Sequence, residues 1–172
     1  MERKRELSRL YTETVDVYDR RYREIQLEKY RFARHYLVPC KRMLEVGCGM
    51  GFYLGELEKL AEMVVGVDLS EGMLRRAKGI LVLADAEFLP FKDEVFDQVL
   101  SITALQNFPN PLAALREMWR VMCKGGRMVL SSLRKKHPLA VLLELVRGAG
   151  FSVVEGIDEE RYEDVFIVAT KS

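Results

Sequence analysis

Three glycines at alternating positions follow a short apolar run and precede a helical segment. They are Gly47, Gly49 and Gly51, and the run before them is Met43–Val46. Glycine permits positive φ and lets a ligand lie against bare backbone, while the first N–H groups of a helix can bind a polar ligand. Because position 52 is Phe, the spacing is G-x-G-x-G and not the G-x-G-x-x-G of dinucleotide-binding folds. The turn therefore predicts a site for a small anionic or adenosine-bearing ligand.

Two carboxylates follow the next two apolar runs. Asp68 comes directly after Met63–Val67, where it can accept both hydroxyls of a ribose. Asp85 follows Ile80–Leu83, where it can accept from an exocyclic amine such as that of adenine. The carboxyl ends of parallel strands meet at one edge of a sheet. We therefore expect the glycine turn and both aspartates to converge on a single crevice.

From about residue 40, short runs rich in Val, Ile and Leu alternate with helical segments. This alternation is typical of an α/β fold with a parallel sheet covered on both faces. The acidic stretch Asp158–Asp164 predicts a hairpin connection, which places an antiparallel pair at the sheet edge. The expected strands are Met43–Val46, Met63–Val67, Ile80–Leu83, Val95–Ser101, Arg127–Ser132, Ser152–Gly156 and Val165–Thr170. The expected helices between them are Phe52–Leu60, Glu71–Lys78, Pro111–Met122 and Pro138–Ala149.

The N-terminal part of the chain differs from this core. Apolar residues recur near helical spacing from Asp19 to Leu37, and Pro39 is expected to end that helix. The chain shows no repeat and no Pro/Gly/Ser linker. We therefore expect a single domain over residues 1–172, with a helical arm or lid at 1–39 and an α/β core at 40–172.

The composition excludes several classes of protein. The 172 residues carry 27 Lys+Arg and 26 Asp+Glu, a net charge of +1, which argues against a non-specific grip on nucleic acid or an anionic membrane. Three cysteines without CxxC spacing indicate neither a disulfide framework nor a metal site. No apolar stretch is long enough to span a membrane. We therefore expect a cytoplasmic protein without a metal.

Four ordered motifs resemble the class I S-adenosylmethionine-dependent methyltransferases, in particular the subgroup that includes ubiquinone/menaquinone-biosynthesis enzymes. They are LEVGCGMGFY, VVGVDLSEGMLRRAK, LADAEFLPFKDEVFDQVLSITALQNF and LREMWRVMCKGGRMVLS, between about residues 40 and 132. The resemblance implies a Rossmann-like, seven-stranded, mostly parallel sheet in the order 3-2-1-4-5-7-6, with strand 7 antiparallel and helices on both faces. It also implies in-line transfer of a methyl group from S-adenosyl-L-methionine, with S-adenosyl-L-homocysteine as the product.

The same resemblance assigns a set of residues to the cofactor: Glu45, Gly47, Gly49, Gly51, Asp68, Leu69, Met73, Asp85, Ala86 and Ser101. It implies that the glutamate and the glycines frame the methionine and ribose portions, and that the first aspartate binds the ribose hydroxyls. The leucine and methionine that follow would lie against the adenine. The second aspartate would take the adenine amino group, with the alanine contacting the ring through its backbone. The serine would lie near the sulfonium.

The side chains that face the methyl acceptor are predicted from position alone. Gln106 and Asn107 follow the fourth strand, Tyr18 and Tyr22 belong to the arm, and His137 follows the fifth strand. A base is needed only if the nucleophile is protonated, so no residue is assigned as catalytic. Each candidate has an alternative: the tyrosines as helix-packing residues, the histidine as an exposed loop residue, and the amides as hydrogen-bonding a turn.

The acceptor itself is expected to be a small molecule, which the segment ITALQNF and the lid-like arm favour. An RNA or protein substrate is the alternative, and a non-catalytic nucleotide-binding protein or a nicotinamide-dependent oxidoreductase is a third hypothesis. Only five residues separate Ser132 from Pro138, where quinone-type enzymes often insert a substrate-covering segment. This departure implies a small open pocket or one completed by a partner subunit, as in a homodimer.

Overall fold

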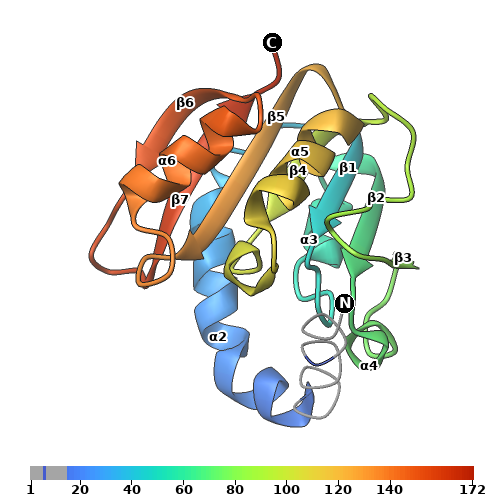
Figure 1. Cartoon of the computed structure of the whole chain (residues 1–172). Coiled ribbons are helices and arrows are strands. Elements are labelled where there is room, and N and C mark those ends of the chain that lie inside the picture. The colour runs from blue at the N-terminus through green and yellow to red at the C-terminus, as the bar shows by residue number, and fades with distance from the viewer. Residues whose placement is uncertain (1–5, 7–14) are drawn as a thin grey trace.

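Seven strands form one mixed sheet in the order β3-β2-β1-β4-β5-β7-β6 in a computed structural model of the chain (Figure 1). The structure describes residue 6 and residues 15–172, with the side chains of the latter range described from Tyr22 onward. The strands are β1 Cys40–Val46, β2 Ala61–Asp68, β3 Ile80–Leu83, β4 Phe96–Ser101, β5 Met122–Leu133, β6 Ser152–Ile157 and β7 Asp164–Thr170. The first five pair in parallel, and β7 runs antiparallel to β5 and β6. The predicted sheet order and the antiparallel β7 are therefore confirmed.

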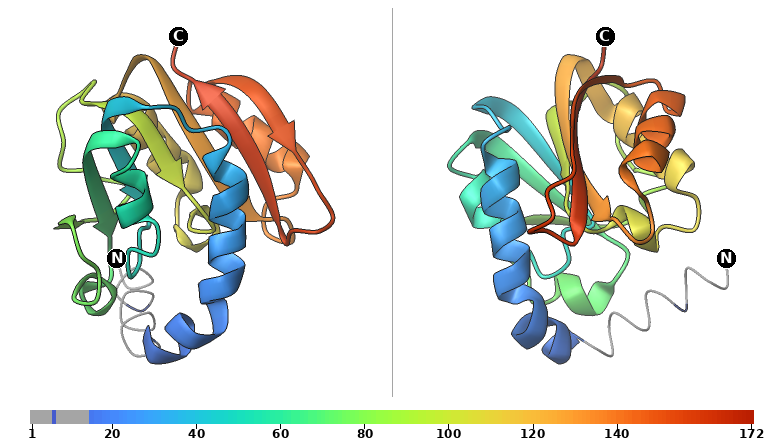
Figure 2. Two further views of the ribbon diagram at one scale, coloured as in Figure 1. Left: turned by 180° about the vertical axis from the view of Figure 1, so that it is seen from behind. Right: turned by 90° about the vertical axis from the view of Figure 1, so that its left-hand side faces the viewer.

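Helices cover both faces of the sheet. They are α2 Val15–Arg34, α3 Leu54–Leu57, α4 Glu71–Leu74, the 3₁₀ helix η1 Leu105–Asn107, α5 Pro111–Val121 and α6 Leu139–Gly148. Figure 2 shows α2 and α3 on the face opposite to α5 and α6. The α5 helix begins where the sequence dictates, because Asn110 accepts from the Ala113 N–H at 3.1 Å and Pro111 occupies the first helical position.

Neighbouring residues of the central strands belong to opposite faces, as the two-residue period of a strand requires. In β1, Met43 packs with α2 and α3, and Leu44 packs with α5 and α6. The layer on the α2 side also contains Tyr30, Ala33, Leu54, Leu57, Leu100, Val129, Phe166 and Val168. The opposite layer contains Val46, Val99, Leu115, Met118, Val121, Met128, Leu130, Leu142, Val146 and Ile167. Because both faces are apolar, the central strands are continuous hydrophobic runs.

Several predicted helix ends differ from the structure for a common reason. The helix predicted to end near Leu37 gives way after Arg34 to turns in which His35, Tyr36 and Leu37 donate to the carbonyls three residues earlier. The helices predicted over 52–60 and 71–78 shorten to α3 and α4 and also end in bonds of this kind. Each has a glycine, Gly55 or Gly72, which weakens helix propensity. The apolar spacing therefore predicted helical turns correctly but overestimated the length of the α-helices.

Strand β5 and the acidic hairpin also differ from expectation. β5 begins at Met122, five residues before the predicted start, with an irregularity opposite Phe96 and Gln98. Asp164, expected in the exposed connection, is the first residue of β7 and is completely buried. A carboxylate that far from water has to be paired, and its partners come from α2, from β5 and from the segment after β4, as described below.

Candidate functional site

The glycine turn between β1 and α3 uses the conformational freedom that its sequence predicted. Gly47, Gly49 and Gly51 have φ values of 76°, 53° and 73°. A Cβ at Gly47 would lie 2.4 Å from the Ala104 Cβ, and one at Gly51 would lie 2.9 Å from Leu54. A Cβ at Gly49 would meet no atom within 4 Å. Gly47 and Gly51 therefore allow close packing, whereas Gly49 leaves its backbone accessible on its open side.

Asp68 joins the carboxyl ends of β1 and β2. Its Oδ2 accepts from the Gly49 N–H at 2.8 Å, and its Oδ1 accepts from the Ser70 N–H at 2.8 Å. Burial raises the pKa of Asp68, and these backbone hydrogen bonds oppose that rise. A carboxylate has about four acceptor positions, so Asp68 can hold the turn and still accept from a ligand hydroxyl.

Glu45 lies on β1 just before the glycine turn and is almost completely buried. Its exposed fraction is 2%, and its Oε2 has no hydrogen-bond partner among the residues that the structure describes. Burial first, and then the nearby Asp68 charge, raises the pKa of Glu45 well above its usual value. A buried acidic group in this state is stabilised by a cation or a hydrogen-bond donor placed beside it. Cys48 of the same turn packs against Gly66, and burial raises the pKa of its thiol.

The residues predicted to contact adenine lie beside Asp68. The register pairs Asp68 with Leu83, so Asp85 follows two residues beyond that pair. The Asp85 Oδ1 accepts from the Glu87 N–H at 2.9 Å, and Ala86 is buried. On the Asp68 side, the Ser70 hydroxyl caps α4 by accepting from the Met73 N–H at 3.3 Å, and Met73 is 2% exposed. Leu69, which precedes this cap, is partly exposed.

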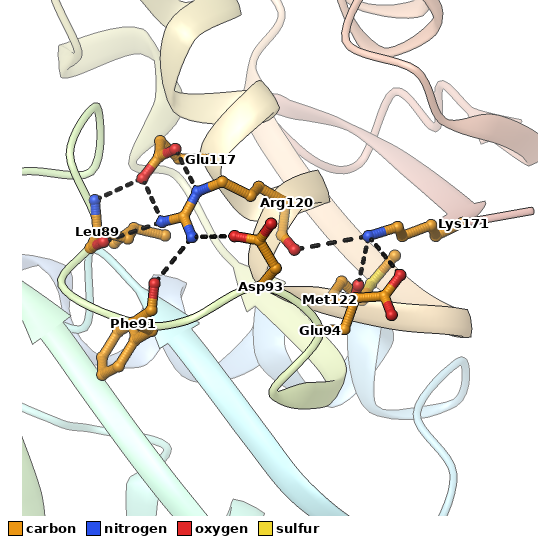
Figure 3. A network of polar contacts seen from close by, with 8 residues as sticks. All are labelled: Leu89, Phe91, Asp93, Glu94, Glu117, Arg120, Met122 and Lys171. Atoms are coloured by element: carbon orange, nitrogen blue, oxygen red, sulfur yellow. Dashed lines mark hydrogen bonds and ion pairs between the residues drawn. The ribbon is translucent and has the colours of Figure 1, made fainter.

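The loop that carries Asp85 and Ala86 is anchored to α5 by Arg120 (Figure 3). The guanidinium donates to the carbonyls of Leu89 and Phe91 at 3.0 and 2.8 Å, and it pairs with Glu117 and Asp93 at 2.7 Å. Glu117 also accepts from the Leu89 N–H at 2.8 Å. The hydrogen bonds from Arg120 lower the pKa of Glu117. Since both ends of the guanidinium fork are used, the network fixes the loop in one position.

The carboxyl end of β4 brings Ser101 and Thr103 to the same edge. The buried Ser101 hydroxyl donates to the Val46 carbonyl at 2.9 Å, directly before the glycine turn. Thr103 has a φ of 52°, which is rare for a β-branched residue. Its hydroxyl donates to Asp164 at 2.7 Å, and its N–H donates to the Ser131 hydroxyl at 3.0 Å. Strain of this kind persists only where surrounding contacts hold it.

The predicted acceptor-side residues Gln106 and His137 are joined through Ser132, which the sequence analysis did not identify. The Gln106 Nε2 donates to the Thr103 carbonyl at 2.6 Å, and its Oε1 accepts from the Ser132 hydroxyl at 3.2 Å. The Ser132 Oγ lies 2.7 Å from the His137 Nδ1. Asn107 belongs to the same 3₁₀ helix, where its N–H donates to the Ala104 carbonyl at 2.9 Å.

The predicted lid residues are placed only in part. Tyr22 is 37% exposed on α2, whereas the side chain of Tyr18 lies outside the described residues. Farther along α2, Gln26 is buried and accepts from the Tyr53 hydroxyl at 2.9 Å. Tyr30 stacks on the Tyr53 ring with centroids 4.9 Å apart, and burial raises the pKa of Tyr30 to about 12. The described part of α2 is therefore fastened to the residues that follow the glycine turn.

Lys29 is a second residue that sequence reasoning missed. It is 2% exposed, and its Nζ lies 2.8 Å from the Asp164 Oδ1 and 3.2 Å from the Thr103 Oγ1. The available signal was its position within the apolar face of the arm helix, between Ile25 and Ala33. A lysine there either reaches solvent or finds a buried partner, and only the fold shows which.

A cavity of about 510 Å³ lies beside the glycine turn, between α2 and the segment before β3. Its charged lining residues are Arg23, Glu58, Arg76 and Lys78. It shares Gly51 with the turn but is not lined by Asp68 or Asp85, so it is a neighbour of the converging strand ends. Among the described residues, no helix is long and apolar enough to cross a membrane.

Comparisons with known proteins show which family the chain resembles. A family model described as a methyltransferase domain matches residues 44–130, just over half of the chain. The chain is 37% identical over 110 residues to a demethylmenaquinone methyltransferase of Roseiflexus sp.. That match covers 58% of this chain and 46% of the relative. The chain thus spans about half the length of the curated relatives it matches.

Two solved structures share the fold over nearly the whole chain. A SAM-dependent methyltransferase from Thermotoga maritima superposes with a TM-score of 0.79 at 24% identity, covering 96% of this chain and 100% of the other. A SAM-dependent methyltransferase from Aquifex aeolicus has a TM-score of 0.80 at 18% identity, covering 94% and 98%. At these identities the likeness bears on the fold, which agrees with the sheet order described above.

Proposed function

Because the chain belongs to the methyltransferase-domain family, the class I S-adenosylmethionine-dependent methyltransferases, we propose that it transfers the methyl group of S-adenosylmethionine to a small molecule. The contact between Gly49 and Asp68 carries the proposal. The Gly49 N–H donates to the Asp68 carboxylate at 2.8 Å. The contact therefore joins a bare glycine backbone and a carboxylate at the carboxyl ends of the adjacent strands β1 and β2. Ligands of open α/β sheets bind in the crevice at this edge.

The residues of this edge fit S-adenosylmethionine. In the proposal Gly49 and Asp68 hold the ribose, and Asp85 and Ala86 bind the adenine. Glu45 presents a buried oxygen that no described residue contacts by a hydrogen bond, next to a second carboxylate. A cationic ligand would relieve both the lost solvation and the repulsion between the two acids. When bound, the cofactor supplies an electrophilic methyl group on a positively charged sulfur.

The remaining cofactor residues would act through shape. Leu69 and the buried Met73 would lie against the adenine, and Gly47 and Gly51 keep the turn narrow. Ser101 holds the Val46 carbonyl immediately before the turn at 2.9 Å. These residues would exclude water and keep the methyl group in line with the acceptor, and positioning of this kind supplies up to about 7–11 kcal/mol of a barrier.

The small-molecule acceptor is inferred from the named relatives and from the site. Several of the matched curated proteins are demethylmenaquinone methyltransferases, whose names give demethylmenaquinone as the methyl acceptor. On the acceptor side of this chain, only five residues separate Ser132 from Pro138, and the side chains of Gln106, Asn107 and His137 lie nearby. We propose that these residues, with Tyr22 of α2, surround the acceptor.

Calorimetry and methyl labelling test the proposal. We expect S-adenosylhomocysteine to bind and NAD to give no response, whereas the reverse would support an oxidoreductase. Incubation with methyl-labelled S-adenosylmethionine and a fractionated cell extract should then place the label in small molecules. Label in RNA or in protein would support the alternative substrate. Binding of S-adenosylhomocysteine without any labelling would support a binding protein without transfer activity.

The compartment and the assembly are part of the same proposal. Cys40, Cys48 and Cys123 are free thiols, which supports a reducing compartment such as the cytoplasm. A homodimer that completes the acceptor side stays a prediction, and sedimentation of the purified chain tests it.

A further inference from the structure

The contacts of Gln106 allow one orientation of its amide. The nitrogen faces the Thr103 carbonyl oxygen at 2.6 Å, and a carbonyl oxygen can only accept, so the NH₂ group must lie on that side. The amide oxygen then faces the Ser132 Oγ at 3.2 Å. Since an amide oxygen carries no proton, this contact is a hydrogen bond only when Ser132 donates its hydroxyl proton.

This orientation decides which nitrogen of His137 carries a proton. The His137 Nδ1 lies 2.7 Å from the same Ser132 oxygen. With its one proton directed at Gln106, that oxygen offers only lone pairs, so the Nδ1 must supply the proton. In this arrangement one proton lies in each of the three contacts, which are Gln106 to Thr103, Ser132 to Gln106 and His137 to Ser132. A neutral imidazole has a single N–H, and the Nε2 therefore keeps a lone pair that can accept a proton.

The surroundings keep the ring neutral. Burial, followed by the charge of Lys136, lowers the pKa of His137 below its usual value. Ser132 of β5 contacts the ring directly, and Gln106 of η1 is connected to it through Ser132. Neither side chain carries a charge. Neutral imidazole is the form that can act as a base.

The ring stands at the edge of the sheet where the glycine turn lies. Gln106 belongs to η1, and Ala104, which precedes that helix, packs directly against Gly47. The backbone after β5 holds His137 in place, because its N–H donates to the Leu133 carbonyl at 2.9 Å. The chain from Gln106 through Ser132 to His137 therefore lies at the carboxyl ends of β4 and β5, next to the turn.

We propose that His137 is the catalytic base of this site and that the acceptor substrate carries a protic nucleophile, an O–H or N–H group. This inference rests on the proposed function. The acceptor atom forms a bond to the methyl carbon as the carbon–sulfur bond breaks and its electron pair stays on sulfur. The proton of the acceptor atom passes to the Nε2 of His137 and later to solvent. Ser132 and Gln106 are positioning residues that select the tautomer.

Nitrogen NMR of protein labelled at histidine tests the tautomer without an activity measurement. The chain has two histidines, so His35→Gln leaves only the signals of the two ring nitrogens of His137. At neutral pH we expect the Nδ1 to be protonated and the Nε2 unprotonated. Ser132→Ala should remove this preference and Ser132→Thr should keep it. A wild-type ring protonated at the Nε2 overturns the proposal, whatever the variants show.

Methyl transfer tests the role. With the labelled cofactor and the small-molecule fraction of a cell extract, we expect His137→Gln to transfer about 10²–10⁴ times more slowly while binding S-adenosylhomocysteine as the wild type does. If the rate of methyl transfer by this variant is within about threefold of the wild-type rate, His137 is not the base, and the proposed function is unaffected. A wild type that fails to bind S-adenosylhomocysteine contradicts the proposed function instead, and NMR still decides the tautomer.

Discussion

Lys29 of α2 and Asp164 of β7 form an ion pair of 2.8 Å in which the two side chains are 3% and 0% exposed. The same carboxylate accepts from the hydroxyls of Thr103 and Ser131 at 2.7 and 2.6 Å. One buried group thus joins the arm helix, the end of β4, β5 and the start of β7. The strained backbone of Thr103 is held by this network, which lies at the acceptor side of the proposed site.

Removing one member of this ion pair should lower the free energy of unfolding. Lys29→Met leaves Asp164 as a buried charge without its counter-ion, so we expect the free energy of unfolding to fall by about 3–5 kcal/mol. Urea unfolding measures it. The double variant with Asp164→Asn should recover part of the loss, because the uncompensated charge is then absent. Glu71→Gln, which breaks the exposed pair with Arg75, is the control and should cost less than about 1 kcal/mol. Equal losses in Lys29→Met and the control would contradict the buried pairing.

Asp68→Asn tests the ribose contact. The amide keeps the shape of the side chain but loses one acceptor oxygen and the charge, so we expect S-adenosylhomocysteine binding to weaken by about 1.5–3 kcal/mol, roughly 10- to 150-fold. Calorimetry measures the Kd. Glu62→Gln lies on the exposed start of the same strand and should leave the Kd unchanged. An unchanged Kd in Asp68→Asn would show that the ribose lies elsewhere.

The sequence predicted those features that depend on local pattern. Apolar runs located the seven strands, and Asp68 and Asp85 were predicted at strand ends because each carboxylate follows an apolar run at the carboxyl edge of the sheet. Lys29 and Asp164 were missed because their pairing joins positions 135 residues apart, which no local pattern contains. Ser132 was missed for a similar reason. Its role depends on the Gln106 amide oxygen, which lies 3.2 Å from the Ser132 hydroxyl only because of the fold.

Gly49→Ala should separate binding from stability. Gly49 and Gly125 both have positive φ, 53° and 75°, and a Cβ at either position would meet no atom within 4 Å. An alanine in this left-handed region costs about 1–2 kcal/mol at either site, which thermal unfolding would show. Only Gly49→Ala adds a methyl group where the ligand is proposed to lie. We therefore expect it to weaken S-adenosylhomocysteine binding at least tenfold more than Gly125→Ala, about 1.4 kcal/mol. Equal binding by the two variants would place the ligand away from the turn.

The raised pKa of Glu45 predicts how cofactor binding depends on pH. Burial and the Asp68 charge favour the protonated form of the free protein, and a bound cation favours the ionised form. Binding of the sulfonium cofactor should therefore release a proton, and its affinity should rise as the pH rises through the pKa of Glu45. S-adenosylhomocysteine has no charge on sulfur, so its affinity should depend on pH less steeply.

Calorimetry with both ligands between about pH 5 and 8 measures this difference, and buffers of different ionisation enthalpy count the released protons. Glu45→Gln should flatten the slope for S-adenosylmethionine, because the amide has no proton to release in this range. Burial raises the pKa of Asp68 too, so Asp68 should also make the affinity rise with pH. This contribution of Asp68 to the pH dependence should persist in Glu45→Gln. Equal slopes for the two ligands in the wild type would show that Glu45 does not respond to the sulfonium charge.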